Sequence, residues 1–142
     1  MTKFSKEIES KKLWLYEIDF YDEEKVLTLF NEITEKHGVF DSLVNNAFDF
    51  SLRTGFNDPS GRIQNMTYEQ LKASFDSGIY WAIRATKFFG IEMKKNAGGS
   101  IVNIASMYGV VVPSPDLYKD TDKFNPPGYS MAKAGLIQFT KY

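Results

Sequence analysis

Two side chains that could act on a ligand lie one helical turn apart near the end of the chain. Tyr129 and Lys133 fall in a stretch rich in Ala, Leu, Lys and Gln, which predicts a helix from residue 129 onward. Residues four apart share one face of a helix, so a phenol and an ammonium ion could act on one ligand there. A Tyr–Lys pair at this spacing also arises by chance. Taken alone, the pair is better explained as a surface coincidence.

Three further polar groups each follow a predicted strand. Ser106 ends the run SIVNIAS, Asn46 lies near the end of DSLVNNA, and Asp19 ends KLWLYEID. Ligands of open α/β sheets bind beyond the carboxyl ends of the strands. These residues are therefore predicted to face one ligand-binding edge. A plainer interpretation of Ser106 is a strand-end hydroxyl that bonds its own backbone.

Strands and helices alternate along the chain. Three apolar or β-branched runs predict strands, at residues 12–19, 41–47 and 100–106. Apolar residues at helical spacing predict helices around 26–33, over 68–95 and from 129 onward. Gly38 is placed to end the first helix, and Thr67 with Gln70 has the spacing of a capping box for the second. This order predicts one α/β domain over residues 1–142, with a parallel sheet.

Composition and charge exclude several classes of protein. Seventeen basic residues nearly balance eighteen acidic ones, which argues against a nucleic-acid partner. The absence of cysteine excludes disulfides and thiolate ligands, and His37 as the single histidine cannot form a cluster, so we expect no metal site. The polar amino terminus and the lack of any run of ~20 apolar residues predict a cytoplasmic protein with no membrane partner.

A strand-final NNA, a strand-final Ser106 and a helical YxxxK at Tyr129 and Lys133, in that order, resemble the short-chain dehydrogenase/reductase family. The resemblance extends over nearly the whole chain. It implies a partial Rossmann-like, doubly wound parallel sheet, here with three strands alternating with three helices. It also implies an oxidoreductase that exchanges a hydride between NAD or NADP and a small-molecule carbonyl or alcohol.

The resemblance assigns roles to named residues. Tyr129 would be the acid/base, since a neighbouring ammonium on Lys133 favours the phenolate of a group whose ordinary pKa is ~10. Lys133 would also bond the nicotinamide ribose, and Ser106 would hold the substrate oxygen. The cofactor-binding residues would be Tyr129 and Lys133 together with Asp19 and Phe20 at the adenine and Asn46 and Ala47 at the adenosine ribose.

One of these assignments has an alternative. Asp19 is also an ordinary turn aspartate after a strand. Asn45, beside Asn46, is expected to secure neighbouring strands by hydrogen bonds rather than to touch cofactor.

The family's long helices commonly pack across a dimer interface, so the full-length protein is expected to be a homo-oligomer. The same apolar stripes are equally explained as faces toward the core.

The sequence departs from the family in four places. It contains no glycine-rich TGxxxGxG segment, and it stops at Tyr142 before the later part of the family fold. We therefore expect a fragment whose strand ending at Asp19 has no neighbour to pair with. Gly78 falls where the family usually presents an asparagine of its proton relay. An insertion between Ser106 and Tyr129, PSPDLYKDTDKFNPPG, is expected to form a lid or rim beside the substrate, or a surface loop stiffened by proline.

Two other functions remain open at this point. A truncated chain could be catalytically inactive and act as an interaction or dimerisation module through its long helices. Another α/β fold, such as a flavodoxin-like binding domain, is the weaker alternative.

The loop at residues 48–65 has no periodicity and is either functional or an insertion.

Overall fold

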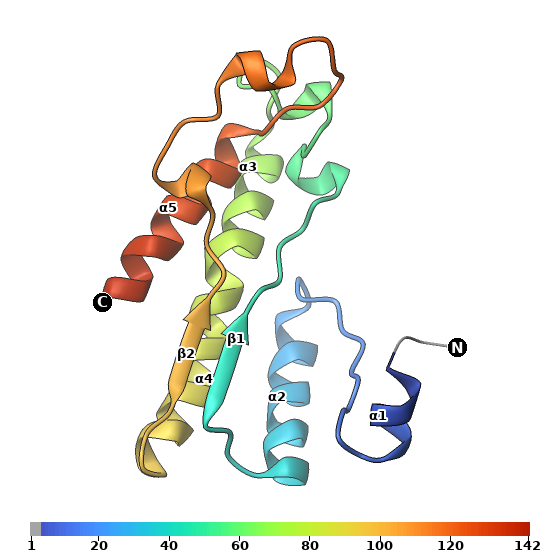
Figure 1. Cartoon of the computed structure of the whole chain (residues 1–142), viewed down its shortest axis with the longest axis vertical. Coiled ribbons are helices and arrows are strands. Elements are labelled where there is room, and N and C mark those ends of the chain that lie inside the picture. The colour runs from blue at the N-terminus through green and yellow to red at the C-terminus, as the bar shows by residue number, and fades with distance from the viewer. Residues whose placement is uncertain (1–3) are drawn as a thin grey trace.

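The computed structural model describes residues 4–142, so the first three residues of the polar amino terminus lie outside it. It contains five helices and two strands within this part of the chain (Figure 1). The helices are α1 (Ser5–Glu9), α2 (Glu23–His37), α3 (Tyr68–Phe75), α4 (Trp81–Lys95) and α5 (Pro127–Lys141). The strands are β1 (Ser42–Asn45) and β2 (Ser100–Asn103). No helix among residues 4–142 is long and apolar enough to cross a membrane.

The two strands form a parallel sheet. Ser42 pairs with Ser100 and Asn45 pairs with Asn103, and a bond from Ile104 N–H to the Asn45 carbonyl, 2.9 Å long, extends the ladder by one step. The chain crosses from one strand to the other through α3 and α4, as a parallel pair requires. The α/β class and the parallel sheet predicted from the sequence are thus confirmed.

The third predicted strand, at residues 12–19, is wrong for this structure. Residues 13–19 have no regular secondary structure, and the sheet of the described residues contains β1 and β2 alone. A strand exists only where a neighbour satisfies its backbone N–H and C=O groups, so a strand-like composition is insufficient. The segment is instead held by side chains. Ile18 packs against the core, and the Tyr16 hydroxyl lies 2.7 Å from His37 Nε2 at the end of α2.

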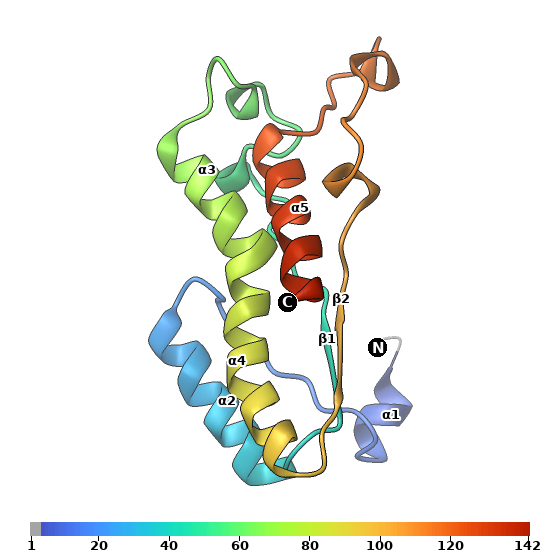
Figure 2. The same ribbon diagram turned by 90° about the vertical axis from the view of Figure 1, so that its left-hand side faces the viewer.

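The long helices lie on one side of the sheet (Figure 2). Leu43 and Ile101 turn inward on the two strands, whereas Val44 and Val102 are exposed. Period-two alternation places successive side chains on opposite faces, so one face of the sheet meets the helices and the other meets solvent. A doubly wound sheet, with long helices on both faces, is therefore not what the described residues form.

The core lies between α2 and α4. Val26 and Phe30 of α2 are buried against Ala85 of α4, with Phe88 and Phe89 packed around them. Phe30 stacks at 4.7 Å from Phe89 between ring centroids. This is the apolar stripe that the sequence predicts for α2, and Asp22 and Gly38 begin and end that helix.

The second predicted helix is one rod with a π-helical turn in its middle. Thr67 and Gln70 form the predicted capping box, with both reciprocal bonds present. Residues Asp76–Tyr80 then form the π turn that joins α3 to α4. Here α3 packs against α5 and against the turn Leu52–Thr54, while α4 packs against both strands.

Gly78 in the π turn has no room for a side chain. A Cβ at this position would lie 2.5 Å from the Cβ of Ala132 on α5 and 3.2 Å from Cε2 of Phe48. Gly90 in α4 differs, since its Cβ would lie 3.5 Å from Ile101 Cδ1, which is ordinary contact. Gly78 therefore sets the approach of α5 to the rod.

We expect Gly78→Ala to lower the free energy of unfolding by roughly 1–3 kcal/mol, because the added methyl overpacks the contact with Ala132. Gly90→Ala is the matched control. It is expected to be neutral or to stabilise by up to about 1 kcal/mol, because alanine is the better helix former. Chemical denaturation of both variants measures the difference. Equal stability of the two variants would contradict the close approach of α5.

Candidate active site

Lys133 is buried where α5 meets the end of β2. Lys133 is only 4% exposed, and its Nζ donates a hydrogen bond of 2.7 Å to the carbonyl of Ile104. No described carboxylate forms an ion pair with it. Burial lowers the pKa of Lys133, because an ammonium ion loses hydration there. A buried cation thus connects the helix to the strand end.

Tyr129 lies one turn before Lys133 on the same side of α5. The Lys133 Nζ is 5.8 Å from the centroid of the Tyr129 ring. Three phenylalanines of the segment after β1 surround that ring. Their centroid distances to it are 4.9 Å for Phe48, 6.2 Å for Phe50 and 5.5 Å for Phe56. The structure therefore brings the predicted phenol and ammonium side by side, within an aromatic cluster that the sequence did not suggest.

Ser106 follows β2 by three residues rather than ending the strand itself. Its Oγ accepts the backbone N–H of Tyr108 at 3.2 Å and so begins the turn Met107–Gly109. That turn packs closely on α5, where a Cβ on Gly109 would lie 2.8 Å from the carbonyl carbon of Lys133. Ser106 therefore makes the local backbone hydrogen bond that the plainer interpretation of this residue expects. The hydroxyl proton has no acceptor among the described residues, so it remains available to a ligand oxygen.

A second pair of hydroxyls, from Tyr108 and Tyr118, lies beside this turn. Tyr118, in the insertion, donates to the Tyr108 hydroxyl at 3.3 Å. This hydrogen bond, with burial, raises the pKa of Tyr118 to about 12, and charge on Tyr108 and Tyr129 contributes in the same direction. Tyr118 is reached through a loop without periodicity, so no spacing in the sequence pointed to it.

The predicted cofactor residues Phe20, Asn46 and Ala47 line one cavity together with Lys133. The cavity has a volume of about 200 Å³ and lies among α2, α4, α5 and the end of β1. Asp19 does not line it. Its carboxylate instead accepts the N–H of Tyr21 at 2.9 Å, which is the turn interpretation of that residue.

Asn45 connects the strands and the rod. Its amide donates to Asn103 Oδ1 at 2.8 Å and to Thr86 Oγ1 at 3.2 Å, and Asn103 in turn donates to Thr140 on α5 at 3.0 Å. The expectation that Asn45 secures neighbouring strands agrees with these side-chain contacts and with the bond from Ile104 N–H to the Asn45 carbonyl. These hydrogen bonds connect the ends of the two strands to each other and to α4 and α5.

Arg84 was not singled out by the sequence, yet it fixes the loop that carries Phe20. Its buried guanidinium pairs with Glu23 at the start of α2 and donates a bond of 3.0 Å to the Phe20 carbonyl. The hydrogen bond from Arg84 lowers the pKa of Glu23. An arginine within an amphipathic helix usually faces solvent, so its spacing gave no signal of this role.

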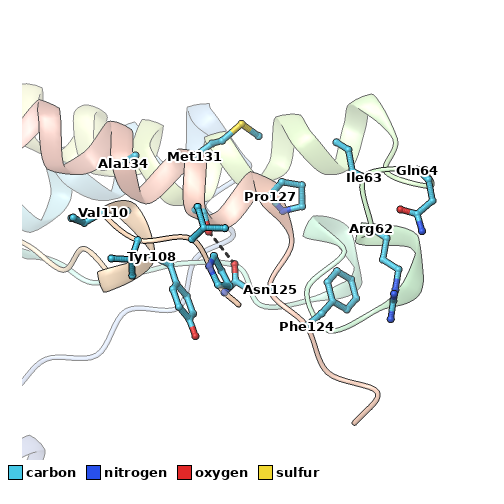
Figure 3. Close-up of a pocket in the computed structure, with 15 residues that line it drawn as sticks. Arg62, Ile63, Gln64, Tyr108, Val110, Phe124, Asn125, Pro127, Met131 and Ala134 are labelled. Atoms are coloured by element: carbon cyan, nitrogen blue, oxygen red, sulfur yellow. Dashed lines mark hydrogen bonds between the residues drawn. The ribbon is translucent and has the colours of Figure 1, made fainter. Parts of the chain in front are cut away.

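Another cavity, of about 620 Å³, lies apart from these groups (Figure 3). Arg62, Tyr108, Asn125 and Met131 contribute to its walls, but Ser106, Tyr129 and Lys133 do not. The insertion supplies part of the wall through Pro113, Phe124, Asn125 and Pro127. It thus forms a rim next to the turn that follows Ser106. Of the three reactive side chains, only Lys133 lines the cavity of about 200 Å³, whereas Ser106 and Tyr129 line neither of these two cavities.

Comparisons with known proteins agree on one family. A family model described as short chain dehydrogenase matches residues 1–142. The post-translational flagellin modification protein A of Campylobacter coli is 27% identical over 126 residues, which cover 89% of this chain and 48% of that protein. The chain therefore spans about half the length of this relative.

Solved structures show the same fold. The structure of ElxO with NADP bound matches with a TM-score of 0.70 and 24% identity, over 98% of this chain and 52% of that one. The structure of 4-hydroxyisoleucine dehydrogenase complexed with NADH matches with a TM-score of 0.69 and 20% identity, over 89% of this chain and 48% of that one. At these identities the likeness concerns the fold.

We expect Lys133→Met to raise the free energy of unfolding at neutral pH by roughly 1 kcal/mol, since it removes a buried charge without an ion-pair partner. The folded-state pKa of Lys133 lies below its ordinary value of 10.5. The gain is therefore complete below the folded-state pKa and shrinks as the pH rises toward 10.5.

Lys141→Met, on the exposed end of the same helix, is the control and should change stability by less than about 0.5 kcal/mol. Denaturation at several pH values separates the two variants. A loss of stability in Lys133→Met at neutral pH would show that the bond to Ile104 outweighs the burial of charge.

Proposed function

This chain belongs to the short-chain dehydrogenase family, and from that membership we propose that it is an oxidoreductase, or part of one, with Tyr129 as its acid/base. The substrate would be a small-molecule carbonyl or alcohol. The observation that carries the proposal is the pairing on α5 of a buried ammonium with a tyrosine ring 5.8 Å away. A lysine held at this depth without a carboxylate partner is difficult to explain by stability alone.

Lys133 would act on Tyr129 through its charge. Its positive charge would stabilise the negative charge that develops on the Tyr129 oxygen while a proton moves between that oxygen and a substrate oxygen. The carbonyl of Ile104 and the close turn at Gly109 hold the lysine in place. Ser106, whose hydroxyl proton has no acceptor within residues 4–142, would donate to the same substrate oxygen and orient it.

NAD or NADP would be held by Phe20, Asn46, Ala47 and Lys133, with Asp19 beside Phe20. These residues fit such a group in part: an amide, an ammonium ion and apolar walls around about 200 Å³ suit a ribose and a flat ring. When bound, the cofactor supplies or accepts the hydride. Proteins of this fold have been solved with NADH and with NADP, which supports either choice.

We expect Tyr129→Phe to reduce turnover by roughly 10²- to 10⁴-fold while leaving nicotinamide-nucleotide affinity nearly unchanged, since only proton transfer is removed. Tyr68→Phe, on a side chain that is 73% exposed, is the control and should have full activity. Fluorescence titration with NADH and NADPH, followed by assays on a panel of small carbonyls, measures both effects.

Retained turnover in Tyr129→Phe would remove that residue from the proposed chemistry. A folded protein that self-associates but binds neither nucleotide would favour the interaction module instead.

A further inference from the structure

Ala132 and the ring of Phe48 together leave no room for a side chain on Gly78. Because a Cβ on Gly78 would meet Ala132 at 2.5 Å and Phe48 at 3.2 Å, the Phe48 ring rests almost on the backbone of the π turn. An asparagine, which the family resemblance would place at position 78, cannot be accommodated there. The absence of a side chain at position 78 and the placement of the Phe48 ring therefore depend on each other.

Phe48 contacts both members of the reactive pair. Its ring meets the Tyr129 ring edge-on, with an interplanar angle of 89° and a centroid distance of 4.9 Å. The Lys133 Nζ lies over the same ring, 5.6 Å from its centroid. An ammonium within about 6 Å of an aromatic face is attracted by the negative charge of that face.

Few other groups compensate the charge of Lys133. Among residues 4–142, its hydrogen-bond partner is the carbonyl of Ile104, and its other favourable contacts are with the rings of Phe48 and Tyr129. A buried ammonium needs several such contacts to keep its place and its proton. The Phe48 ring therefore has a larger influence on Lys133 than a surface ring would.

Phe48 is itself fixed. It packs against Phe50 at 4.8 Å and Phe56 at 6.3 Å, both in the segment that follows β1. Phe50 also reaches Tyr129, at 6.2 Å, but neither it nor Phe56 has a contact with Lys133 or stands over Gly78. Of these three rings, Phe48 is the one that lies near Lys133, Tyr129 and Gly78 together.

We propose that Phe48 is a positioning residue, which occupies the space above Gly78 and holds the Lys133 ammonium and the Tyr129 ring in their relative orientation. The proposal rests on the proposed function for its catalytic meaning. Its structural part, the contact between the ring and the lysine, stands independently of any activity.

The test compares three variants of the protein. Phe48→Leu removes the aromatic face, Phe48→Tyr keeps it, and Phe50→Leu removes a ring from the same cluster without a contact to Lys133. NMR with ¹³Cε-labelled lysine reports the contact, because an aromatic face shifts the resonances of methylene groups beside it. The Lys133 resonance is assigned by its loss in Lys133→Met. We expect this resonance to move only in Phe48→Leu.

The second measurement is affinity for NADH and NADPH by fluorescence titration. Loss of one cation–π contact to Lys133 should weaken binding roughly 2- to 30-fold in Phe48→Leu, whereas Phe48→Tyr and Phe50→Leu should remain near the parent protein. Rescue by the tyrosine variant separates a role of the ring face from a role of mere volume. If Phe48→Leu does not fold, Phe48→Met replaces it as a bulkier side chain without a ring.

Two results would overturn the proposal. One is a Lys133 resonance that stays in place in Phe48→Leu, and the other is an equal shift in Phe50→Leu. Failure of the proposed function appears differently: the parent protein would bind neither nucleotide, while the lysine resonance would still decide whether Phe48 holds the ammonium.

Discussion

The burial of one ammonium ion organises the part of this molecule where its reactive side chains meet. Lys133 lies between α5 and the end of β2, and its hydrogen bond to the Ile104 carbonyl requires the helix to approach the strand closely. Small residues make that approach possible, with Gly109 against the lysine backbone and Gly78 against Ala132. A buried charge without a carboxylate partner opposes stability, so its surroundings must be well packed and polar at one point. The turn after Ser106 and the ring of Phe48 provide this.

Much of the local structure could be predicted from the sequence, because local signals determine it. The apolar spacing of α2, the capping box at Thr67 and the β-branched run before Ser106 each act over a few residues. The strand predicted before Asp19 failed because pairing depends on a neighbour distant in sequence. The pairing of Tyr129 with Lys133 followed from helical spacing. The Phe48 cluster and the Tyr108–Tyr118 bond could not be predicted, since loops carry these residues to the site. The catalytic roles stay predictions.

The site and the core use different parts of the same rod. Through α4 the rod buries Ala85 against α2 and supports both strands, whereas α3 packs on α5 at the level of Tyr129. Asn45 joins these regions, since its amide reaches both Thr86 on α4 and Asn103 on β2. A change in the angle between α3 and α4 would therefore reach Tyr129 and Lys133 by way of α5.

The π turn at Asp76–Tyr80 changes the direction in which the apolar side chains of α4 point relative to those of α3. In a uniform α-helix each residue advances the azimuth by about 100°, so the apolar stripe that faces α5 could not continue onto the stripe that faces the sheet. The wider turn accommodates one extra residue and realigns the two stripes. Insertions or deletions of single residues elsewhere in residues 68–95 would rotate one stripe away from its partner. This turn is the place in the rod where a change of length could be absorbed, and it lies directly beneath Phe48.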